Sequence, residues 1–208
     1  MTTFRNPRAG LILIALPALL SGCISLLPKT PPAQLYRFGS DPAAAPAQNT
    51  AGAFAVRALP IGFERASATD RILTVEGDKT AYIGGARWIT SADSLFEAAV
   101  DHAFAAHAGA SRLLARGETA SPEFALKLDV RRFEVLYEHG PATAPTIKVE
   151  VYAALDNPSN PAVDRERTFL ATISAADNRV GAIVVAFDQA VDKVLRALVS
   201  WVDARGAN

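Results

Sequence analysis

The chain has 208 residues, half of them hydrophobic, which is enough for one medium-sized domain with a single core. Its 21 lysine and arginine residues balance 21 aspartate and glutamate residues, and loss of the first 22 residues would leave a net charge of roughly −2. This balance argues against nucleic acid as a partner and against charge attraction to an anionic membrane surface.

The first 22 residues have the pattern of an export signal. Arg5 and Arg8 precede a stretch of twelve mostly apolar residues, 9–20, and no acidic residue comes before it. A membrane-spanning helix needs about 20 consecutive apolar residues. Because this stretch is shorter and contains Pro17, a bilayer span is the weaker interpretation. We therefore predict a signal peptide over residues 1–22.

Cys23 is the only cysteine of the chain and lies directly after this segment. The sequence Leu20-Ser21-Gly22-Cys23 resembles the lipobox of bacterial lipoproteins, in which the cysteine receives a diacylglyceryl group and the new amino terminus is acylated after cleavage. The alternatives are a small buried residue or the free end of an ordinary signal. A lone thiol in an oxidising compartment favours modification, and several acyl chains at about 0.8 kcal/mol per methylene anchor a protein stably. The two residues after the cysteine are not aspartate, which in such lipoproteins favours the outer membrane.

Residues 23–34 are predicted to form a lipidated, extended tether. Pro28, Pro31 and Pro32 disfavour a helix and favour a solvated, extended chain. At about 3.1 Å per residue, such a tether holds the following domain up to roughly 35 Å from the bilayer.

Residues 35–205 are expected to form a single domain of short strands and two helices. Residues typical of loops occupy 39–52, 77–78 and 157–161 and separate the apolar runs from one another. Gly77-Asp78 favours a hairpin. The predicted strands are 35–38, 54–59, 71–76, 80–83, 112–115, 126–130, 133–137, 147–155 and 165–174.

One pair of these strands shows a change of phase. Apolar residues occupy even positions over 126–130 and odd positions over 133–137. Because side chains alternate between the two faces of a sheet, the slip at Arg131-Arg132 predicts a β-bulge in one continuous strand.

The first helix is predicted to begin at Thr90 or Ser91, and Ser94 with Glu97 also fits a capping box. Gly109 ends the helical pattern. The apolar face consists of Leu95, Phe96, Ala99, Val100, Ala103, Phe104 and His107.

The second helix is the last predicted element, and Asp177 or Asn178 is its predicted cap. Its apolar stripe consists of Val180, Ile183, Val184, Phe187, Val191, Val194, Leu195, Leu198 and Trp201. Both helices need a sheet to cover their apolar faces. The predicted fold class is therefore α+β, with a largely antiparallel sheet and the two amphipathic helices packed on one face.

The sequence contains none of the common catalytic or phosphate-binding motifs, such as G-x-S-x-G, H-E-x-x-H, C-x-x-C and G-x-x-x-x-G-K-[ST]. His102 and His107 diverge by roughly 140° around a helix and cannot easily share a metal, so packed or exposed imidazoles are the simpler interpretation. Gly84-Gly85 has the form of a turn rather than of a phosphate cradle. We predict no catalytic, metal-binding or cofactor-binding residue and no enzyme. A hydrolase triad assembled from distant residues stays open as an alternative.

Charged side chains on the predicted strands fit a solvated sheet face. Asp129, Glu134 and Glu150 are expected at outward positions. Arg131 and Arg132 are neighbours on a strand and point to opposite faces, so a bulge or solvated pair is a better interpretation than a site for an anionic headgroup.

Several short segments, taken in their order, resemble a known family. They are residues 35–38 after Cys23, 58–60 with Arg71-Ile72, Arg87-Trp88, 130–134 and the closing helix over 182–202. This order resembles the ABC-type transport auxiliary lipoprotein components found beside MCE-domain proteins of the Mla and paraquat-inducible kind. The chain departs from the family at Tyr152, where tryptophan is common, and in the small residues of the loop 64–70.

The resemblance implies a periplasm-facing lipoprotein on the outer membrane, working with an MCE-domain substrate-binding protein, an inner-membrane permease and an ATPase. Such a system moves lipids or other hydrophobic molecules across the envelope. The role of this chain would be docking, with the acyl anchor of Cys23 in membrane lipid and no other cofactor, and a homo-oligomer stays open. The alternative is an envelope lipoprotein that assists assembly of an outer-membrane or cell-wall machine without transport.

Overall fold

The computed structural model describes residues 32–39, 53–157 and 165–206. The predicted lipobox Leu20-Ser21-Gly22-Cys23, almost all of the tether, most of the loop 39–52 and most of the turn 157–161 lie outside the described residues. The chain divides into Met1–Pro32 and Ala33–Asn208, and the strands and helices that the structure describes belong to the second unit.

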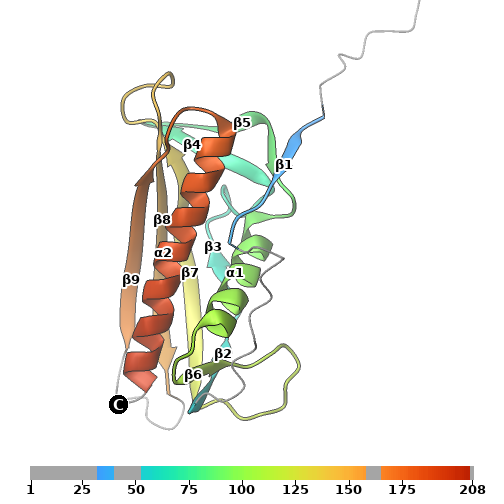
Figure 1. The fold of residues 1–208 in the computed structure, drawn as a ribbon, viewed down its shortest axis with the longest axis vertical. Coiled ribbons are helices and arrows are strands. Elements are labelled where there is room, and N and C mark those ends of the chain that lie inside the picture. The colour runs from blue at the N-terminus through green and yellow to red at the C-terminus, as the bar shows by residue number, and fades with distance from the viewer. Residues whose placement is uncertain (1–31, 40–52, 158–164, 207–208) are drawn as a thin grey trace, which may run out of the picture. The chain divides into compact units, whose positions relative to one another are not determined.

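The described residues contain nine strands and two helices (Figure 1). In chain order they are β1 (Gln34–Tyr36), β2 (Phe54–Ala58), β3 (Gly62–Phe63), β4 (Arg71–Glu76), β5 (Lys79–Trp88), α1 (Ala92–Ala106), β6 (Ser111–Leu113), β7 (Phe124–Leu136), β8 (Thr146–Asp156), β9 (Glu166–Ser174) and α2 (Val180–Gly206).

The sheet is mixed, and β7 lies at its centre. The long ladders β7–β8 and β8–β9 and the hairpin β4–β5 are antiparallel. Shorter parallel pairings join β7 to β2, β3 and β4, β2 to β6, and β5 to β1. The α+β class is confirmed. The sequence did not predict the parallel pairings, because they join segments far apart in the chain and leave no local sequence signal.

The predicted bulge is confirmed in β7. Val130 pairs with Val151 of β8, whereas Arg132 pairs with the next residue, Glu150, so Arg131 is the extra residue. The bulge returns Phe133 to the core side of the sheet, and Phe133 is buried. A change of phase in the sequence was therefore sufficient to locate this irregularity.

Phe133 is the centre of an aromatic cluster that joins the sheet to both helices. Its ring centroid lies 4.8 Å from that of Phe187 on α2, 5.0 Å from that of Phe38 after β1, and 6.5 Å from that of Phe96 on α1. Trp88, the last residue of β5, makes edge contacts with Phe38 and Phe187. Such ring contacts add to the free energy gained from burying the rings.

Helix α1 buries the predicted face through Phe96, Ala99, Val100 and Phe104. Its N-cap is Ser91, as predicted, but the Ser91 hydroxyl contacts the side chains of Asp93 and Ser94 rather than a main-chain N–H. The predicted capping box of Ser94 with Glu97 is wrong, because Ser94 already lies inside the helix.

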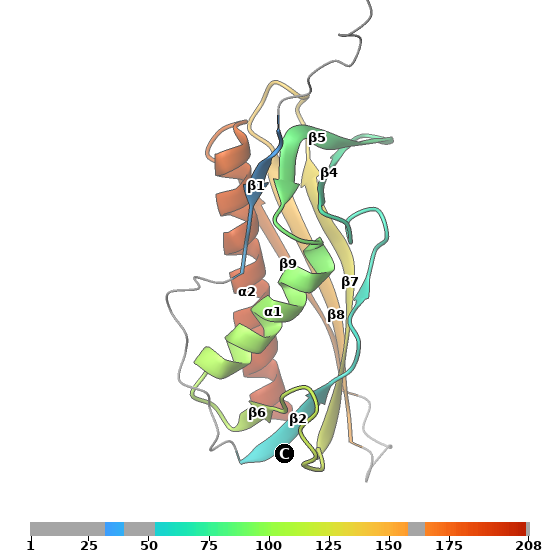
Figure 2. The same ribbon diagram turned by 90° about the vertical axis from the view of Figure 1, so that its right-hand side faces the viewer.

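Helix α2 runs along β8 and β9 and contacts both strands; Figure 2 shows α1 crossing it. Most of its predicted stripe is buried, from Ile183 to Trp201. The two predicted caps hold the preceding turn instead: Asp177 accepts a 2.8 Å hydrogen bond from the N–H of Arg179, and Asn178 accepts one from Tyr137. Within the described ranges, neither helix combines the length and apolar character that crossing a membrane requires.

Two further expectations are corrected. Gly84 and Gly85 lie inside β5 rather than in a turn, and Gly85 has a φ of 69°, where the β4–β5 register shifts. Glu134 was expected to be solvated, yet it is only 8% exposed and accepts a 2.8 Å hydrogen bond from Arg132. The arginine two residues away compensates for burying its carboxylate.

Candidate functional site

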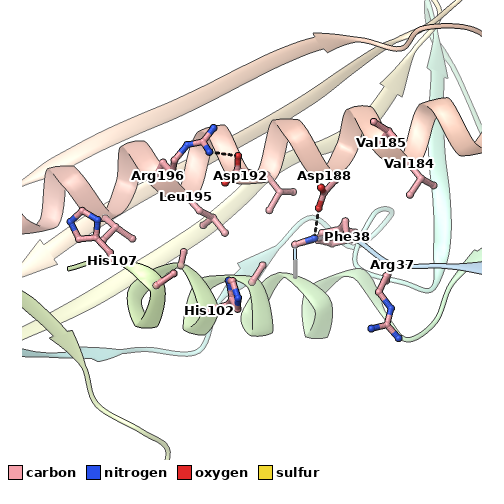
Figure 3. Close-up of a pocket in the computed structure, with 16 residues that line it drawn as sticks. Arg37, Phe38, His102, His107, Val184, Val185, Asp188, Asp192, Leu195 and Arg196 are labelled. Atoms are coloured by element: carbon pink, nitrogen blue, oxygen red, sulfur yellow. Dashed lines mark hydrogen bonds and ion pairs between the residues drawn. The ribbon is translucent and has the colours of Figure 1, made fainter. Parts of the chain in front are cut away.

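A groove lies between α1, α2 and the segment that follows β1, and we call it the interhelical groove (Figure 3). Its volume is about 630 Å³. Apolar side chains of both helices line it, among them Ala103, Val184 and Leu195. Charged side chains, including Arg37 and Asp192, also line it. The groove therefore combines an apolar surface with charged groups, as binding sites often do.

The charged groups of α2 in this groove already have partners. Asp192 pairs with Arg196 one turn later, with 2.5 Å between nitrogen and oxygen. Asp188 accepts a 2.8 Å hydrogen bond from the N–H of Gly39. Together with Arg37, the groove is lined by two arginines and two aspartates, so these charges balance. This balance favours an apolar or mixed binding partner over a strongly charged one.

Gly39 lines the interhelical groove and packs closely against α1. Its φ is 82°, a left-handed conformation that favours glycine. A Cβ atom at this position would lie 2.5 Å from the Cβ of Ala99 on α1. Only glycine allows the chain after β1 to approach α1 this closely while it bonds to Asp188 on α2.

Near the C-terminal ends of α1 and α2, His107 lines the groove and bonds to Asp203 of α2, with 2.5 Å from Nε2 to Oδ2. The second oxygen of Asp203 accepts a 2.8 Å hydrogen bond from the N–H of Ser111, the first residue of β6. A Cβ atom on Gly109 would lie 1.8 Å from Asp203 Oδ2, so glycine is required there too. Asp203 thus joins the end of α1, the following turn and β6.

A second groove, which we call the loop groove, lies on the other side of α1. Its volume is about 900 Å³, and it is lined by the segment after β2, by α1 and by residues 112–118. Apolar residues such as Leu59, Ile61 and Phe104 contribute to it. His102 lines both grooves, so α1 separates them.

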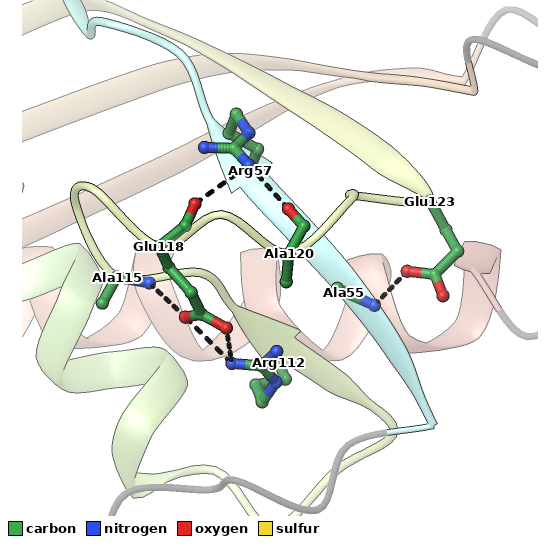
Figure 4. A network of polar contacts seen from close by, with 7 residues as sticks. All are labelled: Ala55, Arg57, Arg112, Ala115, Glu118, Ala120 and Glu123. Atoms are coloured by element: carbon green, nitrogen blue, oxygen red, sulfur yellow. Dashed lines mark hydrogen bonds and ion pairs between the residues drawn. The ribbon is translucent and has the colours of Figure 1, made fainter.

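Glu118 organises the loop after β6, as Figure 4 shows. Its carboxylate accepts 3.1 Å hydrogen bonds from the Arg112 guanidinium and from the N–H of Ala115. These two donors lower the pKa of Glu118, the arginine contributing most. Arg57 of β2 donates a 2.8 Å hydrogen bond to the carbonyl of Ala120, which ties the same loop to the sheet.

The other charges of the loop groove are also balanced. Arg116 pairs with Glu97 of α1 at 2.5 Å. Partial burial raises the pKa of Asp101, although the positive charge of Arg116 acts to lower it.

The residues singled out from the sequence do not gather into one site. His102 and His107 lie on α1 and at its end, and no cluster of three potential metal ligands occurs in the described part of the chain. Arg131 lies 3.5 Å from Asp129 and stacks over Tyr152, while Arg132 bonds to Glu134. The two arginines thus have acidic partners on their own strand, which fits the bulge interpretation rather than a headgroup site.

Sequence reasoning missed the contacts that shape the interhelical groove. Asp188 and Asp203 lie on the polar side of a helical pattern, where a carboxylate normally indicates only exposure to water. Gly39 was assigned to a loop and Gly109 to a helix end. The glycines at positions 39 and 109 were the only hint in the sequence. That they are needed for close packing becomes clear only when the position of the neighbouring helix is known.

Among the solved structures that match this chain are three that cover most of it. A crystal structure of protein XCC0632 from Xanthomonas campestris has 25% sequence identity and a TM-score of 0.66, covering 84% of this chain and 97% of that chain. A crystal structure of an uncharacterized protein has 10% identity and a TM-score of 0.65, covering 83% and 99%. The structure of CT253 from Chlamydia trachomatis has 10% identity and a TM-score of 0.50, covering 73% and 98%. The last two show likeness of fold alone.

A search of the curated proteins gave no match. The family model for the ABC-type transport auxiliary lipoprotein component matches residues 36–199, from the end of β1 to the last turns of α2. The matched region contains α1, most of α2 and, of the described strands, all but the first two residues of β1. The chain therefore belongs to the ABC-type transport auxiliary lipoprotein component family.

Proposed function

We propose that this protein is the lipid-anchored auxiliary subunit of an MCE-type ABC transport system that moves lipids or other hydrophobic molecules across the cell envelope. The observation that carries the proposal is the family match over residues 36–199. The sequence before it supports the proposal, because a lipobox ending at Cys23 and a proline-rich tether precede the matched region. The anchor is in the outer membrane, and the domain faces the periplasm.

The proposed role is docking and not chemistry. Acyl chains on Cys23, a diacylglyceryl group and an amide-linked chain, are the only covalent addition that the role requires. They confine the domain to a layer near the membrane and so raise its effective concentration for partners there. The partners are the MCE-domain protein, the inner-membrane permease and the ATPase.

We assign the interhelical groove as the surface that meets the MCE-domain protein. Its apolar lining from Ala103, Val184 and Leu195 suits an apolar segment at the tip of that protein or the cargo it delivers. Val185, which also lines the groove, is 56% exposed. An exposed apolar side chain beside an apolar groove is a typical contact for a partner.

The test is co-purification from native membranes. The wild-type chain is expected to retain the MCE-domain protein, the permease and the ATPase. Val185→Glu should weaken this association, while Ile89→Glu, a matched control at 50% exposure that does not line the groove, should not. Recovery of wall or outer-membrane assembly factors in place of the transporter would contradict the proposed function, and equal behaviour of the two variants would contradict only the groove assignment.

A second arm tests the anchor. Cys23→Ala should move the protein into the aqueous fraction and should lower recovery of the transporter at equal expression. Mass spectrometry of the wild-type mature protein should show acyl chains on residue 23. An unmodified thiol in the wild type would remove the basis for the lipid anchor.

A further inference from the structure

Strand β9 forms an open edge of the sheet. Among the described residues it pairs only with β8, along its whole length. The N–H of Leu155 bonds to the carbonyl of Arg165, and the N–H of Ala175 bonds to the carbonyl of Pro145, each at 2.9 Å. Both pairs follow the β8–β9 register, so the odd-numbered residues of β9 direct their N–H and carbonyl groups toward β8.

The even-numbered residues of β9 therefore direct their N–H and carbonyl groups to the open edge. These residues are Glu166, Thr168, Leu170, Thr172 and Ser174, and all five are exposed. The central one, Leu170, is 53% exposed. A long edge strand with an exposed apolar side chain at its middle is a template for pairing with another strand.

We propose that two copies of this protein associate through β9, antiparallel, with the two-fold axis at Leu170. In this register Leu170 faces Leu170 of the second copy, Thr168 faces Thr172, and Glu166 faces Ser174. The charged residues of the strand, Glu166 and Arg167, are at one end only. Antiparallel pairing places the charged end of each copy opposite the uncharged end of the other, so no like charges meet. The strand is thus complementary to itself.

Helix α2 also permits this association. It contacts both β8 and β9, and near its C-terminal end Trp201 lies 5.8 Å, ring to ring, from Phe169 of β9. With strands about 4.8 Å apart, a helix over the β8–β9 seam would lie about 10 Å from its copy across the axis. This separation is near the 8–10 Å at which helices pack.

Near Trp201, the flank of α2 that would face its copy carries small side chains, and Lys193 lies on the same flank one turn before Ala197. Val191, Leu195 and Val199 face the interhelical groove on the α1 side. Ala197 lies about 200° around the helix from Leu195 and from Val199, so it is on the opposite flank. Ala197 and its neighbour Ser200 are exposed and lie within about one turn of Trp201, at the level of the proposed axis. Small residues there leave room for a second helix.

Cysteine cross-linking in the full-length protein in native membranes is the first test. In a hydrogen-bonded antiparallel pair the Cα atoms are about 5.5 Å apart, which a disulfide can bridge. After mild oxidation, most of the Leu170→Cys protein should run as a disulfide-linked dimer on non-reducing gels. Ile89→Cys is the control, because Ile89 is 50% exposed, close to the 53% of Leu170, and lines neither groove. Its dimer level should equal that of the wild type, which reports any reaction of Cys23.

Proline substitution is the second test. The N–H of Leu170 points away from β8, so Leu170→Pro should keep the β8–β9 ladder and the thermal unfolding midpoint near that of wild type. It should convert the detergent-extracted dimer to a monomer in a mass measurement by light scattering. A monomeric wild type, a Leu170→Pro variant that stays dimeric, or a Leu170→Cys cross-link to a different protein would each overturn the proposal. None of these outcomes depends on the proposed transport role.

Discussion

His107 and Asp203 connect the end of α1 to α2, with 2.5 Å between Nε2 and Oδ2, and the same carboxylate accepts the N–H of Ser111 at 2.8 Å. Ser111 is only 1% exposed, so loss of this acceptor would leave a buried N–H unpaired. We predict that Asp203→Ala lowers the free energy of unfolding by about 1–3 kcal/mol. Asp203→Asn keeps an acceptor oxygen and should cost less. Urea unfolding of the three proteins checks this order, and equal midpoints would contradict it.

Gly39 should tolerate no side chain. Gly39→Ala places a methyl group against Ala99 and also forces an unfavourable φ, so we expect a loss of about 2–4 kcal/mol in the free energy of unfolding. Gly77→Ala is the matched control, because Gly77 also has a positive φ of 58° but has open space around its Cβ position. The control should lose only about 1–2 kcal/mol. If both substitutions cost the same, the contact with Ala99 is not limiting.

Glu118 should make stability depend on pH. Hydrogen bonds from Arg112 and Ala115 lower its pKa in the folded state below the ordinary value of 4.5. The stabilisation is therefore present above pH 4.5 and is lost as the pH falls through the lower, folded-state pKa. Glu118→Gln should lower the thermal midpoint at neutral pH, and its difference from wild type should shrink as the solution is acidified. A difference that stays constant with pH would show that the charge of Glu118 does not contribute.

Deletion of the bulge residue should be tolerated better than deletion of a regular residue nearby. Without Arg131, alternation from Val130 to Phe133 is preserved, and we expect a cost of about 1 kcal/mol. Without Asp129, Val130 moves to the outward side and Arg131 takes its core position, so the cost should exceed about 3 kcal/mol. Chemical unfolding of both deletion variants provides the comparison. A more stable Asp129 deletion would contradict the assignment of the bulge.

Local periodicity was enough to predict the elements that bury one face. Each of three elements buries one face, and its apolar residues therefore recur at a regular spacing. They are β8 with its strict alternation, β7 with its phase slip, and α2 with its apolar stripe. The Gly77-Asp78 hairpin was predicted for a similar reason, because turn chemistry is local.

The elements that the sequence did not predict depend on distant partners. Strand β3 is two residues long and exists through pairing with β7. The glycine pair 84–85 has the composition of a turn, but β4 and β1 on either side keep that segment in the sheet. Glu134 is buried because Arg132 bonds to it, and an acidic residue alone indicates only solvent. The two grooves could not be predicted from the sequence for the same reason, because each is formed by segments far apart in the chain.

The position of β1 has a mechanical consequence. A load applied through the predicted tether would reach the domain first at Gln34–Tyr36, which among the described strands pair with β5 alone. A ladder this short offers little resistance to pulling. The next residue able to resist is Phe38, whose ring lies 4.9 Å from that of Trp88 and 5.0 Å from that of Phe133. Under tension β1 can therefore separate from β5 while Phe38 stays packed, so the aromatic cluster would bear a load that had already detached β1.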